Sequence, residues 1–560
     1  MIEVLSVANM RQSDARTIEN GTSGRELMMR AGRAIFENVA WKPPVLIVCG
    51  TGNNAGDGYV LAGLLQDAGI ACGVMLLEER FSEDGRYYFD ICRERGINIS
   101  LWTSGEDLKR YSTIVDCIFG TGFKGAVRGK AAEAIKAINE SGAYIVCVDI
   151  NSGLNGDSGM AGDLASATDR TGSGNCVRSD LTVSIGSYKP GHFLNMAKDV
   201  MKRKINCDIG IRPVDRPFRL LESSDLKPYF GPRCNYSNKG TYGYVALIGG
   251  SKRYSGAIRL AAMANAAMRS GAGVVKIAVA DSLCPVVAAN ILESTLFPLS
   301  DDDGEVRFVE SEIAELIRNV RTVAFGMGIG VTAQTAGILD YLLDYFTGRL
   351  IIDADGLTLF AKADRKRILN TRAQLVLTPH IKEFSRLLEG LYGGGEAAGC
   401  DIGSNQTEPK ECEVSGNQTV EKDCGASSNQ TDPKGFGIND ILTDPTGYAV
   451  RYAGDISPSG NAVLLLKGPS TIITDGKEVC MTDTGCAGMA TAGSRDVVSG
   501  ILSAVCAYLP EDDPAFSVAA GAYINGKAGQ LAQSRSNSIS MTAGDTVSCI
   551  AEVITELAGE

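Results

Sequence analysis

A short turn near the C-terminus combines small residues with a single carboxylate. Ala492, Gly493, Ser494, Arg495 and Asp496 stand directly before an apolar run of the kind that forms a buried helix. A helix N-terminus offers unpaired backbone N–H groups and the positive end of the helix dipole, so it attracts phosphate. An Asp placed there can accept the proton of a substrate hydroxyl. Ordinary N-capping by Ser494 or Asp496 explains the same residues, so the turn alone leaves both interpretations open.

A second group of polar side chains lies in the first 160 residues. Asn53, Asn54 and Asp57 stand among glycines directly after an apolar run, Asp116 ends the next such run, and Ser152 follows a third. Carboxylate, amide and hydroxyl oxygens at one edge of a sheet suit a hard cation. The alternative interpretation is a set of turn-forming residues with no ligand.

The elements that must position the second group alternate between buried strands and helices. Residues 1–40 are predicted to be helical, with Met28, Met29, Ala31, Ile35 and Phe36 forming an apolar stripe. Strand, glycine-rich turn and helix form the opening unit of a doubly wound α/β sheet, whose ligands bind at the carboxyl ends of the strands. Strands are predicted at 45–49, 71–77, 112–119, 143–150 and 181–185, with a helix at 131–138.

A second α/β pattern begins near residue 239. It opens with a strand followed by Gly249, Gly250 and Ser251, and an Ala-rich helix is predicted at 256–268. Strands are predicted at 245–248, 274–279, 322–325, 350–353, 375–377 and 462–466. We therefore predict two tandem α/β domains, 1–217 and 218–560, the first with a Rossmann-like doubly wound sheet.

One segment of the second domain, residues 393–437, departs from this pattern. It is polar, rich in Gly, Ser and Asn, and repeats Asn-Gln-Thr at 405–407, 417–419 and 429–431. Such a composition cannot bury a core. We predict a mobile insertion.

The composition narrows the class of protein. The chain has 560 residues and a net charge of −12. Because nucleic acid is itself negatively charged, this net charge argues against nucleic acid as the main ligand. It has 16 Cys but only two His, so a His-rich metal site is excluded, and the Cys residues fit a reducing compartment. No signal peptide and no apolar run of about 18 residues is present. We expect a cytoplasmic protein with no membrane contact, and a homo-oligomer.

Four ordered motifs in residues 1–215 resemble the NAD(P)H-hydrate epimerase family. They are Gly-Asn-Asn-x-Gly-Asp-Gly at 52–58, Asp-Cys-x-Phe-Gly-Thr-Gly at 116–122, Val-Asp-Ile-x-Ser-Gly-Leu-x-x-Asp-x-Gly at 148–159, and Tyr-Lys-Pro-Gly at 188–191. The resemblance implies that Asp149 is the acid/base and that K⁺ is held by Asn54, Asp116 and Ser152. It also implies that the hydrated nucleotide, NADHX or NADPHX, contacts Asn53, Asn54, Ala55, Gly56, Asp57, Gly120, Thr121, Gly122, Phe123, Lys124, Gly125, Ala126 and Asp149.

Residues 235–392 and 440–555 resemble the NAD(P)H-hydrate dehydratase family, which is ribokinase-like. The matching pieces include Gly326-Met327-Gly328-Ile329-Gly330, Asp353-Ala354-Asp355, Thr378-Pro379-His380, Lys467-Gly468 and the stretch 485–500. The resemblance implies a ribokinase-like α/β sandwich. It implies hydrate contacts by Ala257, Gly328, Gly330, His380 and Asp496, and ADP contacts by Lys467, Gly468, Pro469, Ser470, Thr471, Gly493, Ser494 and Arg495.

The implied reaction uses Asp496 as base. Asp496 deprotonates the hydroxyl of the hydrate, which attacks a nucleotide phosphate at the helix N-terminus, with Mg²⁺ on the phosphates. The phosphorylated hydrate then eliminates phosphate and becomes NADH or NADPH. The fusion of the two domains implies ADP as the phosphoryl donor.

Arg495 departs from the family, which has Gly at this position. A positive φ would strain Arg, and its side chain would crowd the phosphate and pair with Asp496; alternatively, the guanidinium would bind the phosphate. We expect the first outcome, in which Arg495 weakens dehydration. Two other functions stay open: a ribokinase-like small-molecule kinase with an N-terminal nucleotide-binding domain, and a non-catalytic nucleotide-binding protein.

Overall fold

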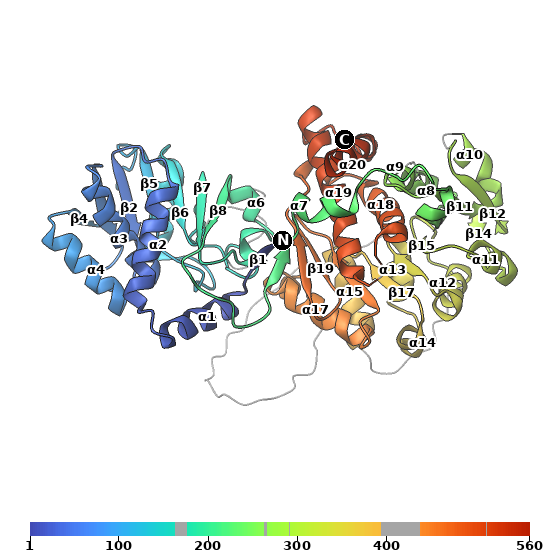
Figure 1. Cartoon of the computed structure of the whole chain (residues 1–560), viewed down its shortest axis with the longest axis horizontal. Helices are drawn as coiled ribbons and strands as arrows, with labels where there is room; N and C mark the ends of the chain where they lie inside the picture. The colour runs from blue at the N-terminus through green and yellow to red at the C-terminus, as the bar shows by residue number, and fades with distance from the viewer. Residues whose placement is uncertain (163–175, 263–265, 290–291, 394–436, 511, 560) are drawn as a thin grey trace, which may run out of the picture.

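The computed structural model describes residues 1–162, 176–262, 266–289, 292–393, 437–510 and 512–559. Within them, two β-sheets covered by helices follow one another along the chain (Figure 1). The predicted insertion lies outside the described residues, apart from its first and last positions.

The first sheet has seven strands, and every neighbouring pair is parallel. The strands are β2 (Val45–Cys49), β3 (Cys72–Leu76), β4 (Asn98–Leu101), β5 (Thr113–Cys117), β6 (Tyr144–Val148), β7 (Leu181–Ile185) and β8 (Lys204–Cys207). Their order, β4-β3-β2-β5-β6-β7-β8, reverses direction between β2 and β5. This is the Rossmann-like order that the sequence predicts, and its switch point is where ligands bind.

Alternate residues of β2 face the two sides of this sheet. Val45, Ile47 and Cys49 belong to a core formed with one set of helices, while Leu46 and Val48 belong to a second core on the other face. Both faces are therefore buried, which explains the continuous apolar run. The helices are α1 (Val7–Glu19), α2 (Gly24–Asn38), α3 (Asn53–Asp67), α4 (Glu83–Glu94), α5 (Gly129–Glu140) and α6 (Ala197–Val200).

The second sheet has eleven strands in the order β1-β9-β20-β19-β18-β17-β16-β15-β10-β11-β12. From β18 to β12 all neighbours are parallel, and the order reverses direction between β15 and β10. Its strands are β1 (Ile2–Val4), β9 (Phe218–Leu220), β10 (Tyr244–Ile248), β11 (Val274–Ala280), β12 (Thr295–Leu299), β15 (Thr322–Phe325), β16 (Arg349–Ile352), β17 (Gln374–Leu377), β18 (Ala462–Leu466), β19 (Thr471–Thr474) and β20 (Val479–Thr482). A separate hairpin pairs β13 (Asp301–Asp302) with β14 (Glu305–Val306).

The helices of this half lie on both sides of its sheet (Figure 1). They are α7 (Ser223–Leu226), α8 (Ser255–Ala262), α9 (Ala266–Arg269), α10 (Cys284–Ala288), α11 (Glu310–Leu316), α12 (Ala333–Tyr345), α13 (Asp355–Phe360), α14 (Arg365–Asn370), α15 (Ile381–Tyr392), α16 (Ile438–Thr443), α17 (Pro445–Ile456), α18 (Ser494–Tyr508), α19 (Pro514–Arg535) and α20 (Ala543–Ala558). Helix α18 is buried along most of its length and contacts β10, β15 and β16. None of the described helices has the length and apolarity needed to cross a membrane.

The first strand of the chain belongs to the second sheet. Residues 2–4 form β1, which pairs antiparallel with β9, whereas the sequence predicted helix over 1–40. Three residues are too few to show a strand periodicity, so the pattern could not reveal it. The next residue joins the first half: the Leu5 N–H donates to the Tyr188 carbonyl at 2.8 Å. The N-terminal segment therefore connects both sheets.

Candidate active sites

A cavity of about 550 Å³ opens at the carboxyl ends of β2 and β5. Met10, Leu27, Met28 and Ile185 are among its apolar lining residues, and Asn53, Asn54, Asp57, Thr121 and Asp149 are among the polar ones. An apolar wall facing a few converging polar groups is typical of a site for a flat organic ring with a polar substituent.

The N-terminus of α3 forms part of the rim of this cavity. Its N-cap, Gly52, has no side chain, and the helix has no side-chain cap hydrogen bond within the described part of the chain. Gly120 lies next to this helix end, because a Cβ built on it would lie 3.3 Å from Asp149 Oδ2 and 3.5 Å from the Asn54 Cβ. The open helix end can therefore bind an anion, and a glycine at 120 leaves the space beside it free.

Asp149 forms a buried ion pair. Its Oδ1 accepts from Lys189 Nζ at 2.5 Å, and its Oδ2 accepts from the Thr121 N–H at 3.2 Å. The Lys189 side chain is only 1% exposed. Burial would raise the pKa of Asp149, but the charge and hydrogen bond of Lys189 outweigh burial and lower it. Asp149 is therefore ionised at neutral pH.

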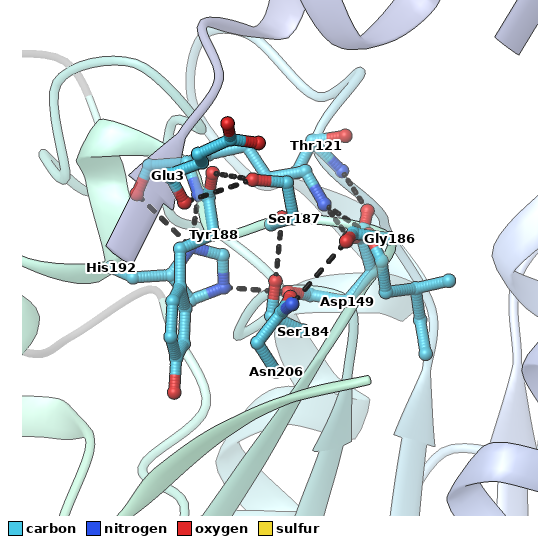
Figure 2. A network of polar contacts seen from close by, with 11 residues as sticks. Glu3, Thr121, Asp149, Ser184, Gly186, Ser187, Tyr188, His192 and Asn206 are labelled. Carbon is cyan, nitrogen blue, oxygen red and sulfur yellow. Dashed lines mark hydrogen bonds and ion pairs between the residues drawn. The ribbon is translucent and has the colours of Figure 1, made fainter. Parts of the chain in front are cut away.

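The backbone around Asp149 is held by His192. Asp149 adopts a positive φ of 64°, rare for a residue other than glycine. Its carbonyl lies 2.7 Å from His192 Nε2, and His192 Nδ1 accepts from the Lys189 N–H at 3.0 Å (Figure 2). Burial, with the charge of Lys189, lowers the pKa of His192 to about 4. A neutral His192 therefore holds both members of the ion pair by their backbones.

Three further carboxyls line the same cavity, of which Asp84 pairs with Arg25 at 3.5 Å. Burial raises the pKa of Asp14 to about 6 and raises the pKa of Asp57 well above its usual range, and the charge of Asp149 adds to both effects. The ionised Asp149 thus shares its cavity with two acids, Asp14 and Asp57, that hold their protons more strongly.

The three residues implied as K⁺ ligands are all buried, but they differ in hydrogen bonding. Asp116 is fully buried; its Oδ1 accepts from Ser152 Oγ at 2.6 Å and its Oδ2 accepts from the Ser152 N–H at 2.9 Å. Both side-chain polar atoms of Asn54 are buried without a partner among the described residues. An unpaired buried amide is costly, so the Asn54 oxygen fits a ligand to a cation.

The cavity contains most of the residues expected at the first site. Asn53, Asn54, Asp57, Gly120, Thr121, Gly122, Phe123 and Asp149 line it. Ala55 and Gly56 lie buried inside α3, and Lys124, Gly125 and Ala126 continue the loop outside the lining.

The second site lies where α18 begins. Gly493 is the N-cap with a left-handed φ of 86°, and no side chain caps the helix. The Ser494 Oγ is buried and unpaired within the described structure. Ordinary capping by Ser494 or Asp496, the alternative left open by the sequence, is therefore wrong.

A buried lysine–aspartate pair lies beside Asp496. Lys467 Nζ donates to Asp353 Oδ1 at 2.8 Å, and Ser499 Oγ donates to Oδ2 at 2.6 Å. Burial, followed by the charge of Asp353, raises the pKa of Asp496 to about 7, and the charges of Lys467 and Arg495 oppose the rise. The Asp496 carboxyl has no hydrogen-bond or ion-pair partner in the described parts of the chain. Such a group can act as a base near neutral pH.

The Arg495 side chain points to a different carboxylate from the one expected. Its Nη1 lies 3.1 Å from Glu383 Oε1, and its backbone belongs to α18, with the positive φ at Gly493 instead. Two of the three grounds for expecting Arg495 to weaken dehydration, strain and pairing with Asp496, are therefore wrong, and the third, crowding of the phosphate, stays a prediction. Glu383 also accepts from the His380 N–H at 2.9 Å, so Arg495 and His380 share one carboxylate.

His380 is the N-cap of α15 and lies next to Lys467. Its Nδ1 accepts from the N–H groups of Lys382 at 3.0 Å and Glu383 at 3.3 Å. A backbone bridge pairs His380 with Lys467. Burial, then the charge of Arg495, lowers the pKa of His380 to about 4, so the ring is neutral. The structure thus gathers His380, Lys467, Arg495 and Asp496 at the carboxyl ends of β17 and β18.

The remaining residues expected at the second site lie in neighbouring turns. Gly328 has a φ of 65°, and a Cβ there would lie 3.0 Å from the Ala257 Cβ, so these two residues are in contact. The Gly330 N–H donates to Asp355 Oδ2 at 2.9 Å. Lys467, Gly468, Pro469, Ser470 and Thr471 form the turn between β18 and β19 and the first residue of β19.

Comparison with known proteins identifies the family. Residues 24–191 match the model of the YjeF-related protein N-terminus, and residues 245–410 and 443–552 match that of NAD(P)H-hydrate dehydratase. A bifunctional NAD(P)H-hydrate repair enzyme Nnr of Moorella thermoacetica is 31% identical over 559 residues, covering 95% of this chain and 93% of its own. The chain belongs to the bifunctional NAD(P)H-hydrate repair enzymes. The resemblance inferred from the motifs is thus confirmed.

Other relatives cover the chain in whole or in part. An Archaeoglobus fulgidus enzyme of the same name is 28% identical over 556 residues, covering 99% of both chains. Among solved structures, the ADP/ATP-dependent NAD(P)H-hydrate dehydratase of Bacillus subtilis, co-crystallised with ATP/Mg²⁺, is 21% identical with a TM-score of 0.45. It covers 61% of this chain and 99% of its own.

Several residues of the two sites were not singled out from the sequence. Lys189 lies in a recognised motif, but no role was assigned to it, and Asp14 is a single acid on the cavity face of α1. Glu383, three positions after His380, was likewise assigned no role. Lys189 lies just beyond the end of a strand, and Asp14 and Glu383 lie on helices with apolar faces. A charged side chain at such a position is the signal that could have identified these residues.

Proposed function

We propose that residues 1–217 epimerise the R and S forms of NAD(P)H-hydrate and that residues 218–560 dehydrate the S form with ADP as phosphoryl donor. The observation that carries the dehydratase assignment is the N-terminus of α18, where the described residues provide no side-chain cap and no partner for the Ser494 Oγ or the Asp496 carboxyl. A base next to an anion site is what hydroxyl phosphorylation requires.

In the epimerase half, Asp149 exchanges a proton with the hydrated ring. Lys189 keeps it ionised and the Thr121 N–H orients it, while His192 fixes its backbone. The apolar wall accommodates the ring, and the open end of α3 suits the phosphates.

In the dehydratase half, Asp496 accepts the proton of the hydroxyl on the S hydrate. The alkoxide oxygen then attacks the terminal phosphorus of ADP and the bond to AMP breaks. Loss of phosphate from the hydrate restores the reduced ring. Lys467, Gly493 and Ser494 would bind phosphate oxygens, and His380, Gly330 and Ala257 would contact the hydrate.

In this proposal the epimerase half binds K⁺ and the dehydratase half uses Mg²⁺. Asn54, Asp116 and Ser152 would hold K⁺, which supplies a fixed positive charge for the nucleotide phosphates. The described residues contain no cluster of three or more His, Cys, Asp or Glu side chains suited to a metal ion. Mg²⁺ would therefore take its ligands mainly from the nucleotide phosphates and water.

We also propose that the protein is located in the cytoplasm. The cysteines within the described ranges are all free, as expected for a reducing compartment such as the cytoplasm. The predicted homo-oligomer is tested by measuring the mass of the protein in solution.

Incubation with a mixture of hydrate epimers tests the proposal. With ADP and Mg²⁺, the absorbance of reduced nicotinamide should recover for both epimers. Recovery of only the S fraction would remove the epimerase assignment. A phosphate ester that accumulates without recovery would indicate a kinase, and ATP in place of ADP tests the donor.

A further inference from the structure

The first half of the chain contacts the turn proposed to bind ADP in the second half. The contact comes from α6 and β8, at the edge of the first sheet that lies nearest the second sheet (Figure 1). Its central residue is Lys198, whose partners lie about 270 to 290 positions further along the chain.

The Lys198 ammonium bonds three backbone carbonyls on two different loops. Its Nζ donates to the Pro469 carbonyl at 2.6 Å, the Thr484 carbonyl at 3.1 Å and the Gly485 carbonyl at 3.5 Å. Pro469 belongs to the turn between β18 and β19, and Thr484 and Gly485 follow β20. An ammonium has three protons, so one side chain links both loops with all its donors used.

A carboxylate completes the link. Asp483 Oδ1 lies 3.5 Å from Lys198 Nζ and accepts from Ser470 Oγ at 3.0 Å, while its Oδ2 lies 2.7 Å from Lys204 Nζ. Burial lowers the pKa of Lys198, and Asp483 opposes that effect. Lys198 and Lys204 of the first half thus bind Asp483 of the second half, and Asp483 in turn accepts a hydrogen bond from Ser470.

We propose that Lys198 is a positioning residue for the nucleotide half-site of the dehydratase, contributed by the epimerase half of the same chain. The inference rests on the proposed binding of ADP by residues 467–471. It goes beyond that function, because it makes the shape of one active site depend on a side chain of the other domain.

The electrostatics of the two loops explain why a cation is needed there. The negative ends of three carbonyl dipoles converge on one point, and without a donor they repel one another. A loop freed of Lys198 would turn these carbonyls toward water and carry Ser470 with it. The turn would then have to be reordered when the diphosphate binds, which costs affinity.

The test uses the full-length protein with Lys198→Met. We expect the KM for ADP and the Kd of ADP measured by titration calorimetry to rise about tenfold, the effect of losing hydrogen bonds to a charged group. The kcat for dehydration should change less than about twofold, because Lys198 does not touch the reacting atoms. Epimerisation should stay unchanged, which also shows that the protein is folded.

Two further variants sharpen the result. Lys202→Met is the matched control: this lysine lies in the same segment, is 79% exposed and pairs with Asp180 of its own half. It should leave the KM for ADP unaltered. Lys198→Arg keeps the charge and several donors, and it should recover part of the lost affinity.

Three outcomes decide the matter. An unchanged KM for ADP in Lys198→Met, with a wild-type protein that binds ADP, overturns the positioning role and leaves the proposed function intact. An equal rise in the KM for ADP in Lys202→Met also overturns the positioning role, because the loss of any lysine charge in this segment would then be enough to raise the KM. A wild-type protein with no ADP binding and no dehydration removes the proposed function itself.

Discussion

The two sites each contain a buried lysine–aspartate pair, used in opposite ways. In the first site, Lys189 pairs directly with Asp149, the proposed catalytic carboxylate. In the second, Lys467 pairs with Asp353, a fully buried neighbour, and Asp496 has no ion-pair partner among the residues that the structure describes. Lys189 therefore lowers the pKa of Asp149, whereas burial, followed by the charge of Asp353, raises the pKa of Asp496 to about 7.

This difference suits two kinds of proton transfer. A carboxylate paired with lysine is ionised at every physiological pH, but it is a weak base. A carboxylate beside a second negative charge accepts a proton more strongly, and it must be ionised before it can act. A lysine paired directly with the catalytic Asp thus lowers its pKa, whereas a buried Asp whose nearby lysine pairs with another carboxylate has a raised pKa.

The largest expected effect is on epimerisation, through Asp149→Asn. The amide cannot exchange the proton, and Lys189 is left buried without its counter-charge. Epimerisation should fall at least about a thousandfold, within the range for loss of an acid/base group. The rates of conversion of the R and S hydrates, each followed separately, measure it.

Dehydration of the purified S epimer serves as the internal control for this variant. It should be retained, because Asp496 lies in the other half of the chain. Loss of both activities in a protein with a native circular dichroism spectrum would show that the sites are not independent.

The reciprocal change, Asp496→Asn, should lower dehydration by roughly a hundred- to a thousandfold. Asn is nearly isosteric and the Lys467–Asp353 pair stays intact, so ADP binding should hold within about threefold. The kcat and the Kd for ADP are measured together. A variant that dehydrates at the parental rate would remove Asp496 as the base.

A smaller effect is expected from potassium at the first site. Asn54→Leu removes two unpaired buried polar atoms, so without K⁺ the variant should be as stable as the parent or more stable, by ~1–3 kcal/mol. Addition of KCl should raise the melting temperature of the parent and not that of the variant. The reference salt is tetramethylammonium chloride at equal ionic strength, and an equal response of both proteins would exclude Asn54 as a ligand.

The sequence predicts the catalytic turns well because strand ends are local features. Short apolar runs locate β2, β5 and β6, and the residue after each run is at the sheet edge whatever its neighbours are. The order of the strands in the sheet then brings Asn54 and Asp149 together. The position of each residue at the sheet edge therefore needs no knowledge of long-range contacts, whereas their proximity depends on the strand order.

The partners of these residues could not be predicted in the same way. Arg495 was expected to pair with Asp496, its neighbour in sequence, yet it pairs with Glu383, which is 112 positions away. Helix geometry accounts for this, since adjacent helical side chains point in different directions. Strand β1 was missed for a related reason, because its pairing partner lies more than two hundred residues later.

The smallest expected effect is on the pH dependence of the two activities, which should differ between the two sites. Because Asp496 must be ionised, kcat/KM for dehydration should rise as the pH passes through about 7, whereas Asp149, with its lowered pKa, gives epimerisation no such rise. Arg495 stabilises the ionised form of Asp496 by its charge. Arg495→Met should therefore move the midpoint for dehydration to higher pH.

The variant should be roughly two- to threefold slower near neutral pH, the size expected for a half-exposed charge, and should match the parent at high pH. Lys382→Met removes an exposed charge next to His380 and is the matched control, with no shift in midpoint. Arg495→Gly tests crowding as well, since it clears the side chain. Faster dehydration by the Gly variant at all pH values would mean that Arg495 obstructs the phosphate after all. A slower Gly variant at high pH, where Asp496 is already ionised, would instead make Arg495 a ligand of the phosphate.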